Sequence, residues 1–267
     1  MVADTHLHAY ACFDMTVWFN SLTANLAKHS SGLLAGMLVR GAAGDRSCDE
    51  LAAAVGDAAT AAGFHLKPVE TAGMLEFDGA ARGKLFLCAG YQVVASERVE
   101  VLSLCDGVSA PFKSARAQDI IRESIQRGGV PVLSWAPGKW WGARGRLVEK
   151  LLEEFQPGEL CLGDSALRPL WLWPEPFIMR RARRAGFRVL AGSDPLPQTG
   201  AERDCGSYFS KLVVPADGNV SLEMIKDALR SGQSLGDGGR RFPPWKSFMR
   251  LLRHHITPPR ARHFPAE

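Results

Sequence analysis

Short apolar runs alternate with amphipathic segments along most of the chain. Apolar runs of four to eight residues predict strands that are buried on both faces, and apolar positions repeating about every 3.6 residues predict helices. Predicted strands span 2–8, 33–39, 64–70, 73–78, 84–89, 98–104, 130–135, 158–163, 187–192 and 207–214, and predicted helices span 14–29, 48–62, 114–127, 143–155, 175–185 and 221–231. Repeated β-α-β units indicate a parallel sheet with right-handed crossovers, and one domain over residues 1–239.

The composition is that of an ordinary globular protein. Of the 267 residues, 46% are apolar and 22% are charged, and this length suits an α/β barrel formed by one domain. No apolar run is long enough for a membrane span, and the early Asp4, His6 and His8 argue against a signal peptide. The six cysteines are scattered without a C-x-x-C pair, which argues against structural zinc and predicts a cytoplasmic location.

The net charge of +4 is unevenly distributed. Residues 240–267 hold seven Lys or Arg and one acid, so this tail carries +6 and residues 1–239 carry −2. A basic tail can attract nucleic acid or anionic lipid. Because the tail is rich in proline and lacks a strong period, we expect it to be a solvated or partly disordered end.

Polar residues follow five of the predicted strands. In α/β barrels the functional groups lie where strands end, so we expect these five ends to converge on one rim. The segments are Asp4–His8, Cys105–Gly107, Gly138–Arg146, Asp164–Pro169 and Ser193–Pro197.

His6 and His8 are the strongest candidates for metal ligands. Residues two apart on a strand project to the same face, so both imidazoles point one way, with Asp4 behind them as a carboxylate that can orient a ring. Asp194 precedes Pro195, which favours an extended backbone, and its carboxylate is a candidate ligand or general base. We therefore predict His6, His8 and Asp194 as metal ligands, with Asp194 and His8 as catalytic residues. The alternatives are ordinary hydrogen-bonded histidines and an aspartate that caps its loop.

The loop 138–146 is a candidate anion site. It places Lys139, Arg144 and Arg146 among three glycines, and an Arg side chain can contact a phosphate or carboxylate through two parallel hydrogen bonds. Its spacing is not that of a P-loop. We add Arg168 as a fourth substrate-binding candidate, although an ion pair with Asp164 is an alternative role for it.

The N-terminal D-T-H-L-H at 4–8 and the late G-S-D at 192–194 resemble the PHP family of metal-dependent phosphoesterases (polymerase and histidinol phosphatase type). The resemblance covers roughly residues 1–232. It implies a distorted, TIM-like (β/α)7 barrel that binds divalent zinc, manganese or iron and hydrolyses phosphate esters. His6 and His8 match the opening H-x-H, and Asp194 matches the aspartate of the late G-S-D-x-H.

Several ligand positions of the family are replaced, which makes this chain a divergent member. Val39-Arg40-Gly41 stands in place of T-D-H, and Gln92 stands at the expected glutamate, with Glu97 and Glu100 nearby. Trp135-Ala136-Pro137 replaces a His-Pro, and Leu196 replaces the final histidine. The resemblance therefore implies one divalent ion rather than a multinuclear centre.

Three functions are consistent with these features. The first is a metal-dependent hydrolase that uses a metal-bound water on a small anionic, phosphate-bearing substrate held by Lys139, Arg144, Arg146 and Arg168. The second is a catalytically degenerate barrel that binds a small anionic ligand without metal. The third is a nucleic-acid-binding protein that acts through its basic tail.

Overall fold

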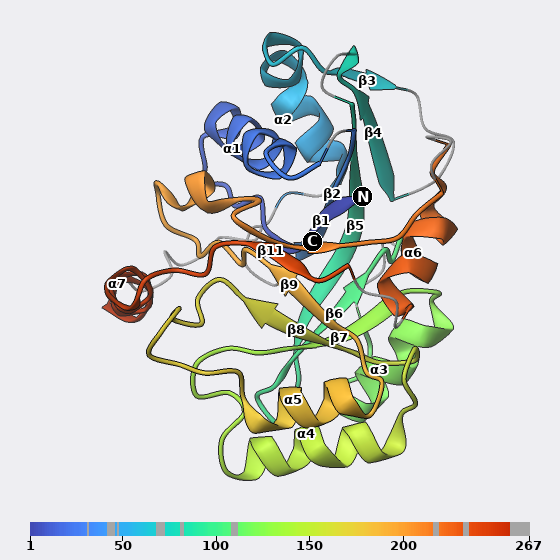
Figure 1. The fold of residues 1–267 in the computed structure, drawn as a ribbon, viewed down its shortest axis with the longest axis vertical. Coiled ribbons are helices and arrows are strands. Elements are labelled where there is room, and N and C mark those ends of the chain that lie inside the picture. The colour runs from blue at the N-terminus through green and yellow to red at the C-terminus, as the bar shows by residue number, and fades with distance from the viewer. Residues whose placement is uncertain are drawn as a thin grey trace, which may run out of the picture.

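The computed structural model describes residues 1–30, 32–41, 46, 48–67, 73–80, 83–107, 112–215, 219–231 and 235–256. A mixed sheet curls into a nearly closed barrel, and helices lie around its outside (Figure 1). The strands are β1 (Val2–Leu7), β2 (Leu33–Arg40), β3 (His65–Lys67), β4 (Met74–Asp78), β5 (Lys84–Val94), β6 (Glu100–Leu104), β7 (Val130–Ser134), β8 (Cys161–Ser165), β9 (Val189–Gly192), β10 (Tyr208–Lys211) and β11 (Asp237–Gly239). The helices are α1 (Met15–Ala27), α2 (Cys48–Ala61), α3 (Ala117–Gln126), α4 (Ala143–Glu154), α5 (Phe177–Arg184), α6 (Leu222–Arg230) and α7 (Pro244–Ile256), with a 3-10 turn at Ala201–Asp204.

The strand order is β11-β10-β1-β2-β5-β6-β7-β8-β9, and the β3–β4 hairpin pairs with β5. β1, β2 and β5 are parallel to one another, as are β7, β8 and β9. β9, the final strand of this order, lies beside β1. Here Thr5 Oγ1 donates to Ala191 O at 2.9 Å, and Asp194 N donates to His6 O at 2.8 Å. These contacts nearly close the barrel.

Strand β6 runs against the direction expected for a parallel sheet. β6 is antiparallel to both β5 and β7, because the connection between β5 and β6 is only five residues long and can form only a hairpin. Leu104, at the end of β6, lies opposite Val130, where β7 begins. The prediction that Cys105–Gly107 joins the other strand ends on one rim is therefore wrong. Asp106 instead pairs with Arg127 at 3.3 Å.

The predicted basic tail is partly helical. α7 occupies residues 244–256, and residues 257–267 lie outside the described part of the chain. β11, which precedes the tail, was also not predicted from the apolar pattern. None of the helices in the described ranges is long and apolar enough to cross a membrane.

Helix α1 shows how the sequence fixes the wall of the barrel. Asp14 caps its first turn by accepting a hydrogen bond from Val17 N at 3.0 Å. Trp18, Phe19 and Leu22 then recur on one face and are fully buried in the core that α1 shares with β1 and β2.

Candidate metal centre

Three predicted ligands converge inside the barrel. One donor atom from each of His6, His8 and Asp194 lies within 4.8 Å of the other two. The Nε2 atoms of the two imidazoles are 3.1 Å apart, and His6 Nε2 is 3.6 Å from Asp194 Oδ1. Gln92 brings a fourth donor atom, because its Oε1 lies 2.9 Å from His6 Nε2.

This donor set fits a single divalent ion. Two nitrogens bound tetrahedrally to zinc at about 2.0–2.1 Å stand roughly 3.3 Å apart, close to the spacing of the two imidazole nitrogens. Three possible acceptors lie around His6 Nε2, namely His8 Nε2, Gln92 Oε1 and Asp194 Oδ1. A single ring N–H cannot donate well to all three. A cation at their centre would satisfy all four atoms at once. His6, His8 and Asp194 are thus the residues that could hold a metal, and Gln92 adds a neutral oxygen.

Local backbone features place these side chains. The pairing of β1 with β2 shifts register between Asp4 and Leu7, an irregularity typical of strands beside functional sites. Asp194 has a φ of 49°, so the expectation of an extended backbone before Pro195 is wrong. Its amide is held by His6 O, and aspartate tolerates the left-handed region better than most residues.

Two serines contact the candidate ligands from behind. Ser165 Oγ donates to Asp194 Oδ2 at 3.0 Å, which leaves Oδ1 on the side of His6. Ser134 Oγ lies 3.4 Å from His6 Nδ1, the ring nitrogen that points away from the other donors. Partners of this kind fix ligand orientation in metal sites. Neither serine was among the predicted site residues, although each is the last residue of a strand that ends at the site.

Asp4 has a structural role rather than the predicted one behind the imidazoles. Its carboxylate accepts hydrogen bonds from Ser193 Oγ at 2.5 Å, Ser193 N at 2.9 Å, Gly206 N at 2.8 Å and His6 N at 3.2 Å. Burial raises the pKa of Asp4 to about 6, although these hydrogen bonds favour the charged form. Asp4 therefore fastens β1 to the chain that follows β9.

The candidate glutamates lie away from the donor atoms. Glu97 Oε2 accepts a hydrogen bond from Ala117 N at 3.1 Å at the start of α3. Glu100 forms an ion pair with Lys139 at 2.5 Å. Of these three residues, Gln92 is thus the one whose side chain contacts a predicted ligand, His6.

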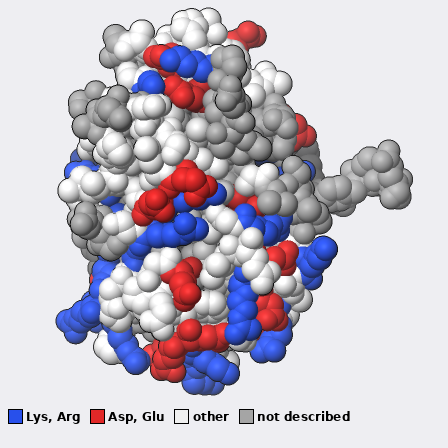
Figure 2. All heavy atoms as spheres, turned by 90° about the vertical axis from the view of Figure 1, so that its right-hand side faces the viewer, with Lys and Arg blue, Asp and Glu red and all other residues white. Residues whose placement is uncertain are grey.

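The basic loop follows β7, whose last residue contacts His6. Lys139 is half-buried in its ion pair with Glu100, and Arg144 Nη2 donates to Gly138 O at 2.8 Å. Arg146 is exposed on α4. The loop therefore places three cations after the end of β7, but Lys139 and Arg144 are already bound to other groups of the protein. On the face in Figure 2, basic and acidic side chains are interspersed rather than gathered into one patch.

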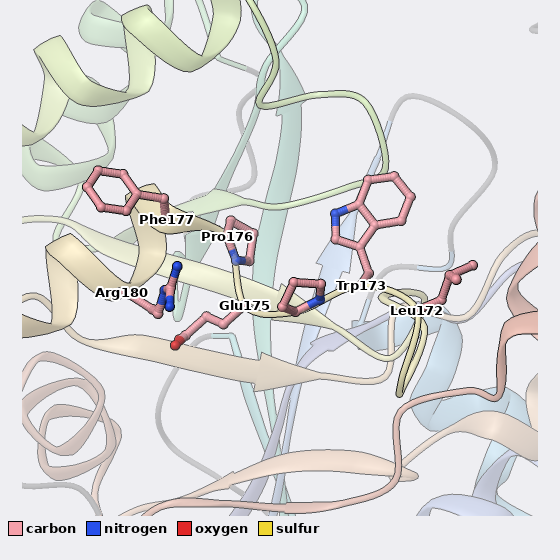
Figure 3. Close-up of a pocket in the computed structure, with 7 residues that line it drawn as sticks. Leu172, Trp173, Glu175, Pro176, Phe177 and Arg180 are labelled. Carbon is pink, nitrogen blue, oxygen red and sulfur yellow. The ribbon is translucent and has the colours of Figure 1, made fainter.

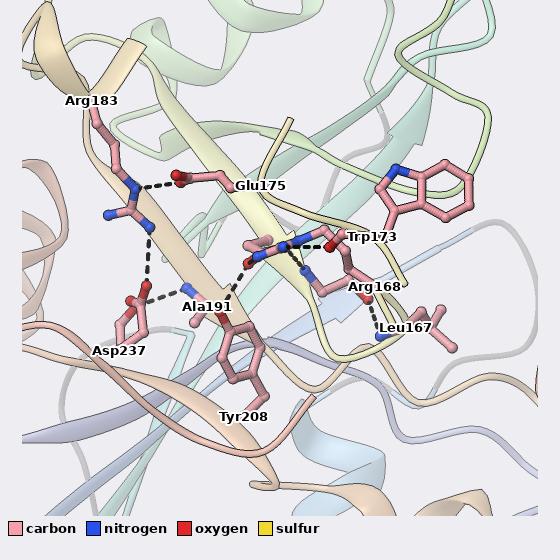
Figure 4. Close-up of polar contacts among 11 residues, drawn as sticks. Leu167, Arg168, Trp173, Glu175, Arg183, Ala191, Tyr208 and Asp237 are labelled. Atoms are coloured by element: carbon pink, nitrogen blue, oxygen red, sulfur yellow. Dashed lines mark hydrogen bonds and ion pairs between the residues drawn. The ribbon is translucent and has the colours of Figure 1, made fainter. Parts of the chain in front are cut away.

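Arg168 is committed to a buried ion pair. Its Nε and Nη2 bind Asp164 Oδ1 and Oδ2 at 2.7 and 2.5 Å, and the Tyr208 hydroxyl donates to Asp164 at 2.8 Å (Figure 4). Burial opposes the charge of Arg168, but the paired carboxylate raises its pKa above the usual value. Burial and Asp164 also raise the pKa of Tyr208. Arg168 thus has its alternative role, the ion pair with Asp164, and it is 95% buried rather than offered to a ligand.

An aromatic cluster covers the loops after β7 and β8. Trp141 is 58% exposed and stacks on Trp173 with ring centroids 5.3 Å apart. A hollow of about 480 Å³ adjoins Trp173, and Figure 3 shows Trp173 at one end with Phe177 and Arg180 at the other. Trp140 is buried, and its Nε1 donates to Ser134 O. Trp140 therefore packs against the end of β7, and Trp141 lies on the surface.

Comparisons with known proteins identify relatives in fold. PsfC from Pseudomonas syringae aligns with a TM-score of 0.53 and 12% identity over 95% of this chain and 97% of its own. The lesion-specific endonuclease PfuEndoQ from Pyrococcus furiosus aligns with a TM-score of 0.50 and 14% identity over 91% of this chain and 59% of its own. A two-domain protein from Bacteroides vulgatus, containing a predicted PHP-like metal-dependent phosphoesterase, aligns with a TM-score of 0.48 and 11% identity over 93% of this chain and 69% of its own.

At these identities the first two structures bear on the fold alone. They support the predicted barrel-like α/β architecture, whereas the count of seven β/α units stays a prediction. The sequence matches no family model and no curated protein.

Proposed function

We propose that the protein is a metal-dependent hydrolase of phosphate esters. The observation that carries the proposal is the convergence of donor atoms from His6, His8 and Asp194 within 4.8 Å. His6 and His8 are almost fully buried, so this cluster differs from the exposed acidic groups that are common on protein surfaces. The fold is also shared with an endonuclease, a protein that cleaves phosphate esters.

In this proposal one divalent zinc, manganese or iron ion is held by His6, His8 and Asp194, with Gln92 Oε1 beside it. Such an ion would supply Lewis acidity and would lower the pKa of a bound water molecule to near neutrality. Ser165 fixes one oxygen of Asp194, so Oδ1 is the atom positioned to bind the ion or to accept a proton from water. His8 would bind the same ion or accept the same proton through Nε2, which lies 3.1 Å from His6 Nε2.

The substrate in this proposal is a small molecule with a phosphate group. Lys139, Arg144 and Arg146 follow the strand that ends at His6, and they carry fixed positive charge. Lys139 can exchange Glu100 for phosphate, and Arg144 can exchange a carbonyl oxygen for it. Arg168 is left out of the binding group, because removing it from Asp164 would leave a buried carboxylate unpaired.

The test compares metal content and activity in matched variants. Wild-type protein purified without added metal is analysed by mass spectrometry beside His6→Ala/His8→Ala and the control His29→Ala/His65→Ala, which changes two exposed histidines. We expect about one ion per chain in the wild type and the control, and hydrolysis of p-nitrophenyl phosphate or its diester that is lost in the site variant. Absence of metal in all three proteins, with no thermal stabilisation by added Zn²⁺, Mn²⁺ or Fe²⁺, would overturn the proposal.

A further inference from the structure

Helix α7 carries its apolar side chains on the outside. Trp245, Phe248 and Ile256 are 68%, 64% and 68% exposed, and Met249 and Leu252 are 40% and 38% exposed. At 3.6 residues per turn these five positions fall within an arc of about 100°. The helix therefore presents a continuous apolar stripe to its surroundings.

The polar side of α7 faces the protein. Lys246 and Arg250 both form ion pairs with Asp204, the latter at 2.9 Å. Arg250 Nη2 also donates to Gly200 O at 3.0 Å, and Gln198 Nε2 donates to Arg250 O at 2.7 Å. Ser247, between the two cations, is buried. The usual arrangement, in which a surface helix buries its apolar face, is thus reversed.

The exposed apolar surface extends beyond the helix. Phe242, just before α7, exchanges backbone hydrogen bonds with the loop after β8: its amide donates to Ala166 O and its carbonyl accepts from Leu170 N. In that loop Trp171 and Leu172 are 79% and 71% exposed. α7 lies on the side of the barrel opposite α6 (Figure 1). Two further exposed apolar side chains thus lie in the loop that is hydrogen-bonded to the chain just before α7.

We infer that α7 is an interfacial helix that docks the protein on an anionic lipid surface. Helices that lie in the plane of a membrane have one apolar face with Trp and Phe, and basic residues around it. Arg253 is exposed next to the stripe, and residues 240–267 carry +6 overall. Anionic lipid attracts such a segment, and the apolar stripe then inserts among the acyl chains.

Other occupants of the stripe fit less well. Two copies packed through α7 would bring two strongly basic segments together. Residues 257–267 hold a single large apolar residue, Phe264, so these eleven residues are too few in apolar side chains to cover the stripe. Nucleic acid is held mainly through contacts of cations with its phosphates, and such contacts leave the five exposed apolar side chains of the stripe in water.

The test measures co-sedimentation of the full chain with vesicles. We expect binding to phosphatidylcholine vesicles that contain a quarter phosphatidylglycerol, weaker binding at high salt, and little binding to phosphatidylcholine alone. Trp245→Ala/Phe248→Ala should weaken binding at least about tenfold for each ring removed, because in the wild type each ring moves from water into the lipid on binding. The control Leu66→Ala/Met224→Ala, with two exposed apolar residues on β3 and α6, should bind as the wild type does.

Arg253→Gln should weaken binding to the anionic vesicles about fivefold, and the melting temperature of every variant should be unchanged because these side chains are exposed. Three results overturn the inference. The first is equal binding to neutral and anionic vesicles. The second is vesicle binding that Trp245→Ala/Phe248→Ala does not weaken. The third is a wild-type protein that does not bind vesicles but forms a dimer or a DNA complex, which Trp245→Ala/Phe248→Ala abolishes.

Discussion

A methyl group at residue 192 would test how the barrel closes at the candidate site. Gly192 ends β9 against β1, and a Cβ there would lie 2.4 Å from His6 Cβ and 2.5 Å from His6 N. Non-bonded carbon atoms prefer about 3.5–4.0 Å, so the two strands must part by about 1 Å. No rotamer change relieves the contact, because the clashing atoms belong to the backbone or are fixed to it. Overpacking of this kind costs about 1–3 kcal/mol, and each kcal/mol lowers the melting temperature of a chain of this size by about 2–4 °C.

The same displacement should reach the metal ligands. Gly192→Ala moves His6 away from Asp194, so we expect affinity for Zn²⁺ or Mn²⁺ to fall at least about tenfold, as when a ligand loses its supporting contact. Thermal unfolding and titration calorimetry measure the two effects. The control is Gly56→Ala on α2, where a Cβ meets nothing within 4 Å and should stabilise the helix by about 0.5–1 kcal/mol. If Gly192→Ala melts and binds metal like the wild type, the close approach of β9 to β1 is refuted.

Three further predictions concern the ligands and the buried ion pair. At a metal concentration of about one hundred times Kd, the wild type should gain roughly 2.7 kcal/mol, a rise of about 5–11 °C in a thermal scan, and His6→Ala should show no rise. Gln92→Glu adds a carboxylate beside His6 Nε2, so calorimetry should give tighter divalent binding than in the wild type; unchanged affinity would exclude Gln92 from the site. Arg168→Met leaves Asp164 buried without its partner and should cost about 3–5 kcal/mol in denaturant unfolding, whereas Arg168→Met/Asp164→Asn should cost clearly less.

The apolar pattern was sufficient to predict most elements of the barrel. Strands β2, β7 and β9 and helices α2, α4 and α6 begin and end within three residues of the predicted ranges. The pattern carried no information on strand direction, which depends on the length of the connection between β5 and β6. Strand β6 was placed at almost the right residues, yet its end was assigned to the wrong side of the barrel.

The same limit applies to the candidate site. The spacing of His6 and His8 and the aspartate after β9 were enough to predict that three donors come together. The resemblance placed Gln92 at a ligand position, but whether Gln92, Glu97 or Glu100 points into the barrel could not be predicted, since a shift of one residue along the strand would turn each side chain to the opposite face. The partners of Asp4 could not be predicted either, because Ser193 and Gly206 are distant in sequence and meet it only when β9 closes on β1.

The positions of the cations bear on the choice between the hydrolase and a metal-free anion-binding barrel. In the second hypothesis, Lys or Arg side chains would replace the ion between the donors and hold the ligand directly. Arg168 is instead paired with Asp164, and Lys139 with Glu100, while Arg144 binds a carbonyl of its own loop. In the part of the chain that the structure describes, each of these three cations is thus held by a partner other than His6, His8 and Asp194, while the four donor atoms lie close together. A divalent ion satisfies this cluster better than the cations of the described chain do, so the geometry favours the metal-dependent hydrolase.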